Sequence, residues 1–260
     1  MFRRKNKRRT YNKRRRRGAG IGAYISPQIA KVLIIVLIAL VFAVGVSVPL
    51  FSYYSDKEIL NISESDNVEY FTEEQRAELL RVVNRGNPLD KSYVPSLEET
   101  DGILVNSLMV KSLNKMLEDA EKDGVHLKLK SGYISYEEQS ELFREKYNAY
   151  IQNDSISAVK AEAKTVRTTP RAGQSEAQTG LLAEFYDADE SDFEKSKSFV
   201  WLGENSAEYG FVLRFPKEKQ SVTAMDYSPS VYRFTGSKNA MQMRIFGMCL
   251  EEYKDYLSQK

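Results

Sequence analysis

Apolar residues recur with the spacing of an amphipathic helix between Ser107 and Asp123, and Gly124 follows as a stop signal. The residues that share the apolar face are Met109, Leu113, Met116, Leu117 and Ala120. We expect further helices from the N-cap residue Thr72 onward and in residues 136–152, 203–209 and 240–256. Residues 153–179 are expected to form a helix followed by a loop.

Apolar and polar residues alternate at 125–130, which read Val-His-Leu-Lys-Leu-Lys and predict a half-buried strand. Shorter strands are expected at residues 181–185, 211–215 and 231–234. The helices and strands do not alternate as a regular βαβ repeat, and no internal repeat is present. The pattern therefore predicts an α+β fold.

One segment, residues 32–51, reads VLIIVLIALVFAVGVSVPLF and contains no charged side chain. A helix of this length spans about 30 Å, which is the thickness of the hydrocarbon core of a membrane. The segment is longer than the apolar region of a cleaved signal peptide, and no small-residue cleavage site follows it. We therefore predict one transmembrane helix, an uncleaved signal anchor at residues 32–51, rather than a cleaved leader or a buried core helix.

The distribution of charge predicts how this helix is oriented. The 260 residues include 38 basic and 36 acidic side chains, but residues 1–31 contain 12 Lys and Arg and no acid. Residues 32–260 therefore carry 26 basic and 36 acidic side chains. The positive-inside rule makes residues 1–31 a basic cytoplasmic tail and places the rest of the chain outside, with a stalk at 52–79 and a folded domain at 80–260.

The basic tail has two interpretations, a contact with anionic membrane lipid or a nucleic-acid interface. The tail contains no foldable or aromatic-interleaved binding module, which favours lipid and predicts no nucleic-acid partner.

Cysteine and histidine each occur once, as Cys249 and His126. A single Cys excludes a disulfide framework and a Cys-rich zinc site. A single His excludes any metal centre that needs two imidazoles from one chain. It also allows a Ser-His-Asp triad only if His126 is the base. Cys249 follows apolar residues and is expected to be a small buried side chain rather than a nucleophile.

Four stretches, in order, resemble the VanY-type D,D-carboxypeptidases, which remove the terminal D-alanine from peptidoglycan stem peptides. These stretches lie at 84–95, at 131–139 (beginning SGYIS), at 173–181 (GQSEAQTGL) and at 201–234 (including YGFVLRFP), and a final LEEY lies at 250–253. The resemblance covers about residues 80–257. It implies a small antiparallel sheet with flanking helices, similar to the D,D-carboxypeptidase and hedgehog folds.

The resemblance also implies a zinc ion held by two His and one Asp, with a Glu as base and an Arg for the substrate carboxylate. The motif Ser-x-His-x-x-Gly-x-Ala-x-Asp places the first His at Ala177 and the Asp at Glu184. The motif Glu-Pro-Trp-His-x-Arg places the base at Ser228 and the second His at Val231. The substrate arginine of Ser-Gly-Tyr-Arg-Ser falls at Ile134.

Methyl and isopropyl groups have no lone pairs to donate, so we expect no zinc, no other cofactor and no catalytic residue in this chain. His126 lies outside both metal motifs and is expected to be a surface residue. An all-oxygen Ca²⁺ or Mg²⁺ site formed by Glu184, Asp187 and Asp226 is disfavoured, because their spacing matches no known loop pattern. The polar residues expected to line the former cleft are Gln139, Ser175, Glu184 and Arg233.

These observations predict a single-pass protein of a bacterial cell membrane with its N-terminus in the cytoplasm. Its external domain is expected to be catalytically inactive and to bind a peptidoglycan stem peptide or an envelope protein partner. One alternative is an active D-Ala-D-Ala carboxypeptidase with a rebuilt site. Another is a structural or regulatory membrane anchor that acts through its basic tail.

Overall fold

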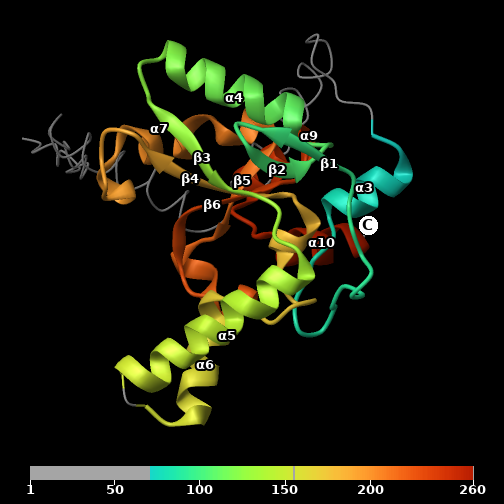
Figure 1. Ribbon diagram of the computed structural model, residues 1–260. Helices are drawn as coiled ribbons and strands as arrows, with labels where there is room; N and C mark the ends of the chain where they lie inside the picture. Colours follow the sequence, from blue (N-terminus) through green and yellow to red (C-terminus); the bar gives the residue numbers. More distant parts are fainter. Residues whose placement is uncertain (1–70, 155, 260) are drawn as a thin grey trace, which may run out of the picture. The chain divides into compact units, whose positions relative to one another are not determined.

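Two antiparallel sheets organise residues 71–154 and 156–259, the residues that the computed structural model describes (Figure 1). The larger sheet has four strands in the order β3-β4-β6-β5. They are β3 (Leu127–Ser131), β4 (Leu182–Asp187), β5 (Phe211–Phe215) and β6 (Ser228–Phe234). The smaller sheet pairs β1 (Leu97–Thr100) with β2 (Ile103–Asn106). The α+β fold and the small antiparallel sheet are thus confirmed.

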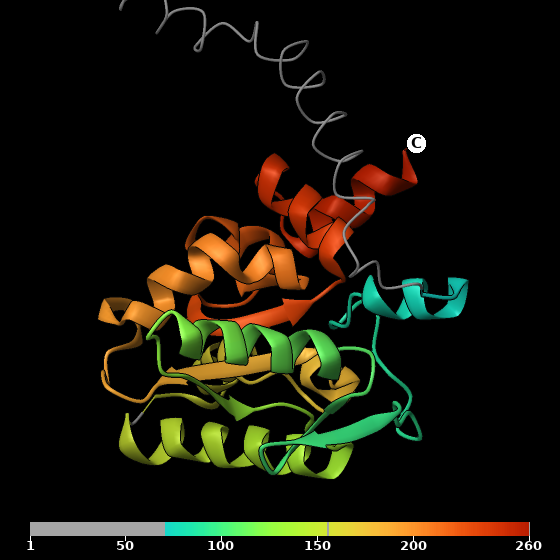
Figure 2. The same ribbon diagram turned by 90° about the horizontal axis from the view of Figure 1, so that it is seen from above.

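Helices surround the larger sheet. They are α3 (Glu73–Leu79), α4 (Val110–Lys122), α5 (Tyr136–Asn153), α6 (Ala158–Thr168), α7 (Lys197–Asn205), α8 (Gln220–Thr223), α9 (Ser237–Phe246) and α10 (Leu250–Ser258). Short 3₁₀ helices lie between them, namely η2 (Glu176–Thr179), η3 (Phe193–Lys195), η4 (Ser206–Tyr209) and η5 (Lys217–Lys219). Helix α4 and the pair α5–α6 lie on opposite sides of the larger sheet, and α5–α6 project away from it (Figures 1 and 2).

The main hydrophobic core lies between α4 and one face of the larger sheet. The sheet contributes Leu127, Leu129, Ala183, Phe185, Phe211, Tyr232 and Phe234. Helix α4 contributes Val110, Leu113, Met116 and Ala120, which include three of the five residues expected on its apolar face. The apolar residues that recur with helical spacing in α4, and those that alternate along the strands, therefore lie in the core.

Two helices begin where the sequence provides a complete N-terminal cap. Thr72 accepts a hydrogen bond from the backbone of Gln75, whose side chain accepts one from the backbone of Thr72. Ser135 and Glu138 form the same reciprocal pair at the start of α5. Such capping boxes satisfy amide groups that a helix leaves without partners at its first turn. The expected helix starts at Thr72 and Tyr136 are thus confirmed.

The β1–β2 hairpin is an element that our sequence interpretation did not predict. Its turn is Asp101-Gly102, and both residues have positive φ, 51° and 77°. Asp-Gly between two short apolar segments is a strong hairpin signal, because a type I′ turn requires positive φ at both central positions. The signal was present in the sequence, although the strands are only four residues long.

Two of the predicted helices have different bounds in the structure. The helix expected at 203–209 is α7 followed by η4, and α7 begins early because the side chain of Ser196 caps it. The single helix expected at 240–256 is divided into α9 and α10 by Gly247, whose φ is 61°. Cys249 therefore caps α10 rather than lying inside a helix, and it is buried as expected.

The N-terminal predictions fall largely outside the described residues. This applies to the basic tail, to the transmembrane segment at 32–51 and to residues 52–70 of the stalk. Among residues 71–154 and 156–259, no helix is long and apolar enough to cross a membrane. The predicted domain boundary at residue 80 is too late, because Leu79 of α3 is fully buried in the main core.

Candidate functional site

Three positions form a row across neighbouring strands of the larger sheet. Glu184 of β4 is the register partner of Ser131 in β3 on one side and of Val231 in β6 on the other. The sheet register thus brings together Glu184 and Val231, two of the positions that the sequence motifs assign to metal ligands, although they are 47 residues apart in the numbering. We call Ser131, Glu184 and Val231 the strand row.

The carboxylate of Glu184 is engaged by two neighbours on β3. Lys130 Nζ lies 2.8 Å from Glu184 Oε1, and Ser131 Oγ donates to Glu184 Oε2 at 3.0 Å. The Glu184 side chain is 30 % exposed and that of Lys130 is 58 % exposed. Both oxygens of the only acidic group in the strand row are therefore used in surface hydrogen bonds within the protein.

Ala177 and Ile134 are also close in space. The backbone amide of Ile134, which follows β3, donates to the carbonyl of Ala177 in η2 at 3.3 Å. The predicted base position, Ser228, begins β6 and pairs with Phe215. It lies three residues before Val231, about 10 Å along the strand at the usual rise.

The residues at these positions do not fit a zinc ion. Ala177 and Val231 carry hydrocarbon side chains, so Glu184 is the single possible donor among the three ligand positions. Within residues 71–154 and 156–259, no group of three or more His, Cys, Asp and Glu side chains is arranged to hold a metal ion. The chemistry of the donor set therefore disagrees with a zinc centre at this place.

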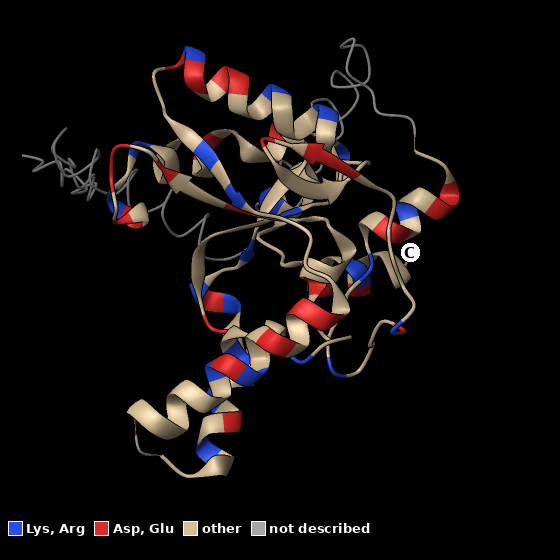
Figure 3. Cartoon of the chain, in the orientation of Figure 1, with Lys and Arg blue, Asp and Glu red and all other residues tan. Residues whose placement is uncertain are grey.

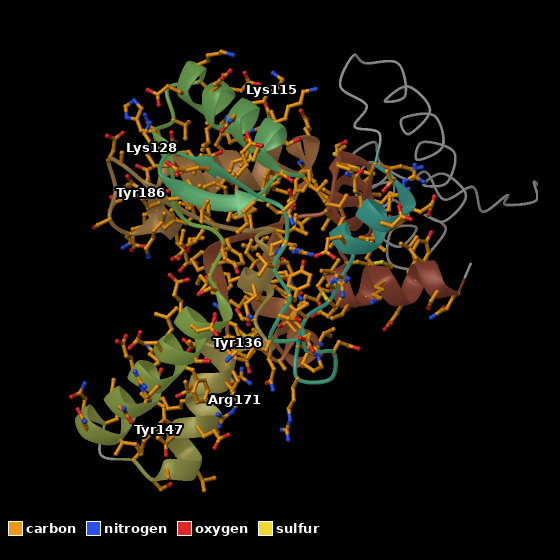
Figure 4. All side chains as sticks on the ribbon, turned by 45° about the vertical axis from the view of Figure 1, so that its right-hand side comes forward. Lys115, Lys128, Tyr136, Tyr147, Arg171 and Tyr186 are labelled. Carbon is orange, nitrogen blue, oxygen red and sulfur yellow. The ribbon has the colours of Figure 1, made fainter. Side chains whose placement is uncertain are left out.

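His126 lies at the other end of β3. It precedes Ser131 by five residues, about 16 Å along an extended strand. Its Nδ1 is 2.8 Å from Asp189 Oδ2, and its side chain is exposed, as expected. The same end of the strand pair carries Lys128 and its register partner Tyr186 (Figure 4). The imidazole is thus too distant to replace a ligand at Val231.

The two aspartates considered for an all-oxygen Ca²⁺ or Mg²⁺ site, Asp187 and Asp226, bind other groups of the protein. Asp187 is buried and accepts hydrogen bonds from the backbone amides of Asp189 and Ser198, at 2.8 and 3.1 Å. Asp226 forms an ion pair with Arg167 at 2.6 Å. Neither shares a partner with Glu184.

Two of the predicted cleft residues are almost fully buried. Gln139 is 2 % exposed and donates through Nε2 to the carbonyl of Pro170 at 2.6 Å, which joins α5 to the segment after α6. Ser175 is 6 % exposed and is the residue before η2. Among the four predicted residues, Glu184 is the one with a substantially exposed side chain.

Arg233 also lies in the interior, which differs from the prediction that it lines the cleft. It has no exposed surface, and its guanidinium donates to Thr179 Oγ1 at 2.7 Å. The same group donates to three backbone carbonyls at the end of α3, those of Glu78, Leu79 and Arg81, at 3.2 to 3.3 Å. Burial lowers the pKa of Arg233. Its role is to tie α3 to β6.

A second buried arginine forms an ion cluster that sequence reasoning missed. Arg214 of β5 donates to Glu176 Oε2 at 2.7 Å and to Glu251 Oε1 at 2.6 Å. Although burial alone would lower the pKa of Arg214, the two carboxylates raise it. The sequence signal is an arginine within an otherwise apolar strand, but nothing local identifies its partners in η2 and α10.

A shallow depression of about 360 Å³ lies beside Ile134 on the exposed side of α5. Its lining residues are Tyr133, Ile134, Glu138, Glu141, Leu142 and Glu145. A neighbouring depression of about 330 Å³ shares Leu142 and Glu145 and continues to Ala149 and Thr169. Acidic residues are evident along this helix in Figure 3. Our sequence interpretation missed this surface, although the 3–4 spacing of the glutamates was visible.

Comparison with known proteins agrees with the resemblance. The family model for VanY, D-alanyl-D-alanine carboxypeptidase, matches residues 102–237. A D-alanyl-D-alanine carboxypeptidase of Enterococcus faecalis is 35 % identical over 176 residues, which are 67 % of this chain and 65 % of that protein. The chain belongs to the VanY family.

Solved structures that are similar to this chain share its fold. A vancomycin-resistance D,D-pentapeptidase VanY mutant in complex with Zn(II) superposes with a TM-score of 0.62 at 30 % identity, covering 68 % of this chain and 99 % of that one. The LD-carboxypeptidase LdcB superposes with a TM-score of 0.60 at 26 % identity, covering 74 % and 92 %. The chain spans just under two thirds of its E. faecalis relative, so the match concerns the domain rather than that whole protein.

Proposed function

We propose that this chain is a non-hydrolytic VanY-family protein that binds cell-wall peptide, or an envelope protein partner, through the surface around its strand row. Membership of the family supports a role in peptidoglycan metabolism. One observation supports the proposed loss of hydrolysis. Of the three positions assigned to metal ligands, Glu184 has a carboxylate that is already bound by Lys130 and Ser131, and Ala177 and Val231 have hydrocarbon side chains.

Hydrolysis of a D-Ala-D-Ala bond by the chemistry that the family resemblance implies needs a polarised water and a base within hydrogen-bond reach. At the base position Ser228 offers a hydroxyl, which is a poor base at neutral pH. At the position for gripping the substrate carboxylate, Ile134 offers no charge. The chain therefore has no suitable side chain at the base position or at the position that binds the substrate carboxylate, while the fold that would hold a peptide is retained.

The proposed location is the outer face of a bacterial cell membrane. The apolar segment at 32–51 would span the bilayer once, and residues 1–31 would stay in the cytoplasm against anionic lipid. The sequence pattern alone supports this part of the proposal. A protease-accessibility experiment on intact cells expressing the full chain tests it, because residues beyond 52 should be cleaved from outside and residues 1–31 should be protected.

A direct assay of the full chain in detergent tests the loss of hydrolysis. We expect no release of D-alanine from a D-Ala-D-Ala peptide and no stoichiometric zinc by elemental analysis, with or without added zinc. Zinc-dependent turnover by the wild-type chain would instead support the active enzyme with a rebuilt site.

A four-site variant provides the matched control. Ala177→His, Glu184→Asp, Ser228→Glu and Val231→His together return the family residues to these four positions, of which the sheet register pairs Glu184 with Val231. We expect this variant to bind zinc, and Ile134→Arg added to it to favour turnover. Zinc binding by the variant but not by the wild type would assign the loss to these side chains rather than to a distorted fold.

The alternative of a membrane anchor acting through its basic tail makes a different prediction. Deleting residues 3–17 would then abolish function in cells, while substitutions around the strand row would have no effect. Titration of the full chain with muropeptides separates the two, because only the peptide-binding proposal predicts saturable heat.

A further inference from the structure

We propose that Asp101-Gly102, the turn of the β1–β2 hairpin, is a modification site at which isoaspartate forms spontaneously (Figure 1). The reaction needs no enzyme and no co-reactant other than water. An Asp-Gly sequence favours it, because glycine has no side chain to hinder attack by its own backbone nitrogen. This chemistry is independent of the proposed peptide binding.

The first step joins the glycine nitrogen to the aspartate side chain. The backbone nitrogen of Gly102 attacks Cγ of Asp101 in its carboxylic acid form, a C–N bond forms, and the hydroxyl group leaves as water with the amide proton. The product is a five-membered succinimide ring. A water molecule then adds to one ring carbonyl and breaks the bond from that carbonyl to nitrogen. Opening at the side-chain carbonyl restores aspartate, whereas opening at the backbone carbonyl leaves the chain running through Cβ, which is isoaspartate.

A second Asp-Gly pair in the chain provides an internal comparison. It is Asp123-Gly124, at the end of α4. All four residues are exposed, and the two glycines have similar positive φ, 77° at Gly102 and 72° at Gly124. At both glycines the space that a Cβ would occupy is open, with no described atom beyond the chain neighbours within 4 Å. The two pairs therefore match in sequence, in exposure and in the space around the reacting nitrogen.

At Asp123-Gly124 hydrogen bonds hold both reacting groups. Trp201 Nε1 donates to Asp123 Oδ2 at 2.8 Å, and the backbone amide of Gly124 donates to the carbonyl of Glu121 at 3.0 Å. Before the ring can close, the Gly124 amide must leave that carbonyl and the carboxylate must turn away from the indole. Hydrogen bonds to charged groups are stronger than those between neutral groups, so their loss slows the reaction.

At Asp101-Gly102 neither reacting group is held in this way. Among residues 71–154 and 156–259, none forms a hydrogen bond or ion pair with the Asp101 carboxylate, and none accepts from the Gly102 amide. Asp101 also has a φ of 51°, which few residues with a side chain adopt. Ring closure at this turn therefore breaks no contact with the described part of the protein.

Isoaspartate at position 101 would lengthen the turn of the hairpin. The backbone gains one atom between Thr100 and Ile103, the register pair next to the turn. A two-residue turn fits the twist of its strands closely, so we expect this end of the hairpin to open. The other end of β2 is fixed, because Asn106 Nδ2 donates to the carbonyl of Thr179 at 2.9 Å. The modification would therefore loosen one end of the hairpin and leave the other end attached to η2.

Peptide mapping of the full chain in detergent tests the inference. The protein is incubated at neutral pH and labelled with an isoaspartyl methyltransferase, and mass spectrometry then locates the label at position 101 or 123. We expect isoaspartate to accumulate about tenfold faster at 101 than at 123, the effect of one hydrogen bond to a charged group that must first be lost. In guanidinium chloride, which unfolds the chain, the two rates should become similar.

The variants Asp101→Asn and Asp123→Asn form a matched pair. Asparagine closes the same ring with loss of ammonia instead of water, and it tolerates the positive φ of the turn. We expect residue 101 of the first variant to be converted about tenfold faster than residue 123 of the second when both are folded, and at a similar rate when both are unfolded. Circular dichroism of the two variants should match that of the wild type.

Equal rates at 101 and 123 in the folded protein would overturn the inference, because hydrogen bonding would then not determine where the ring closes. It would also be overturned if the unfolded chain reacts at position 101 and the folded chain does not, since the turn would then prevent the reaction. A faster rate at 101 in the folded state alone would support it. Hydrogen exchange at Ile103 should then be faster in the isoaspartate form than in the unmodified protein, and unchanged exchange there would refute the opening of the hairpin.

Discussion

At the β5 edge of the larger sheet, Arg214 lies in the interior between Glu176 and Glu251, whereas in β4 the carboxylate of Glu184 meets Lys130 at the surface. Both are ion pairs with short contacts, at 2.7 and 2.8 Å. They differ in burial, because the Arg214 and Glu176 side chains are 3 % and 2 % exposed while those of Lys130 and Glu184 are 58 % and 30 % exposed.

This difference explains how a fold can persist while the residues at its site positions change. Removing one partner of a buried ion pair leaves an uncompensated charge in the interior, which is strongly destabilising. Substituting a residue near a solvated pair costs little, because water replaces the lost contact. Of the positions that the resemblance assigns to metal ligands, Glu184 and Val231 are partly exposed, whereas Ala177 is buried. The two partly exposed positions can therefore diverge without unfolding the domain.

The largest expected effect is at the buried cluster. Replacing Arg214 by alanine leaves Glu176 and Glu251 without their common cation, and we expect a loss of about 3–5 kcal/mol in unfolding free energy. Urea unfolding of the full chain measures this loss, with Arg85→Ala as the control because Arg85 is exposed. If Arg214→Ala loses no more unfolding free energy than Arg85→Ala, burial of the ion cluster does not distinguish the two regions.

Acid unfolding sharpens the comparison further. Burial would raise the pKa of Glu176, but the charge of Arg214 outweighs it and holds the pKa below its usual value of 4.5. A carboxyl whose pKa is lower in the folded state stabilises the protein above the unfolded pKa, and this contribution is lost as pH falls through the folded value. We therefore expect the unfolding free energy to fall below about pH 4.5, more steeply in wild type than in Glu176→Gln.

The smallest expected effect is at the strand row. Replacing Glu184 by glutamine removes the charge but keeps a group that can accept from Ser131. We expect the unfolding free energy to change by less than about 1 kcal/mol, as for other exposed ion pairs. High salt should reduce even this difference, since ions screen exposed charges. A loss as large as that of Arg214→Ala would show that the two regions do not differ in the way that their burial indicates.

The elements that the sequence predicted well are those determined by local pattern. The bounds of β5 agree with the expected 211–215, and α5 begins at the expected Tyr136, because alternation and a capping box are properties of neighbouring residues. The β1–β2 hairpin was missed although Asp101-Gly102 marked it, and Gly247 was not recognised as the break between α9 and α10.

The site was predictable only in part, for a physical reason. Motif order identified Ala177, Glu184 and Val231, and the register of β4 and β6 then made Glu184 and Val231 neighbours. For Arg233 the sequence could not distinguish a cleft residue from an interior one, because its partner carbonyls are about 150 residues away in the chain. Pairings between distant segments are set by the whole fold and leave no local signal.

The bonds of Arg233 also have a mechanical consequence. Helix α3 is the first helix in the described part of the chain. The backbone carbonyls of Glu78, Leu79 and Arg81, at its end and just after it, accept hydrogen bonds from the guanidinium of Arg233 on β6, an inner strand of the sheet. Because these carbonyls lie at the C-terminal end of α3 and just after it, a force applied to the chain before α3 could unwind the helix but would then be transmitted to β6 through this side chain. The domain resists tension from its N-terminal side at a fixed point, and that point is Arg233.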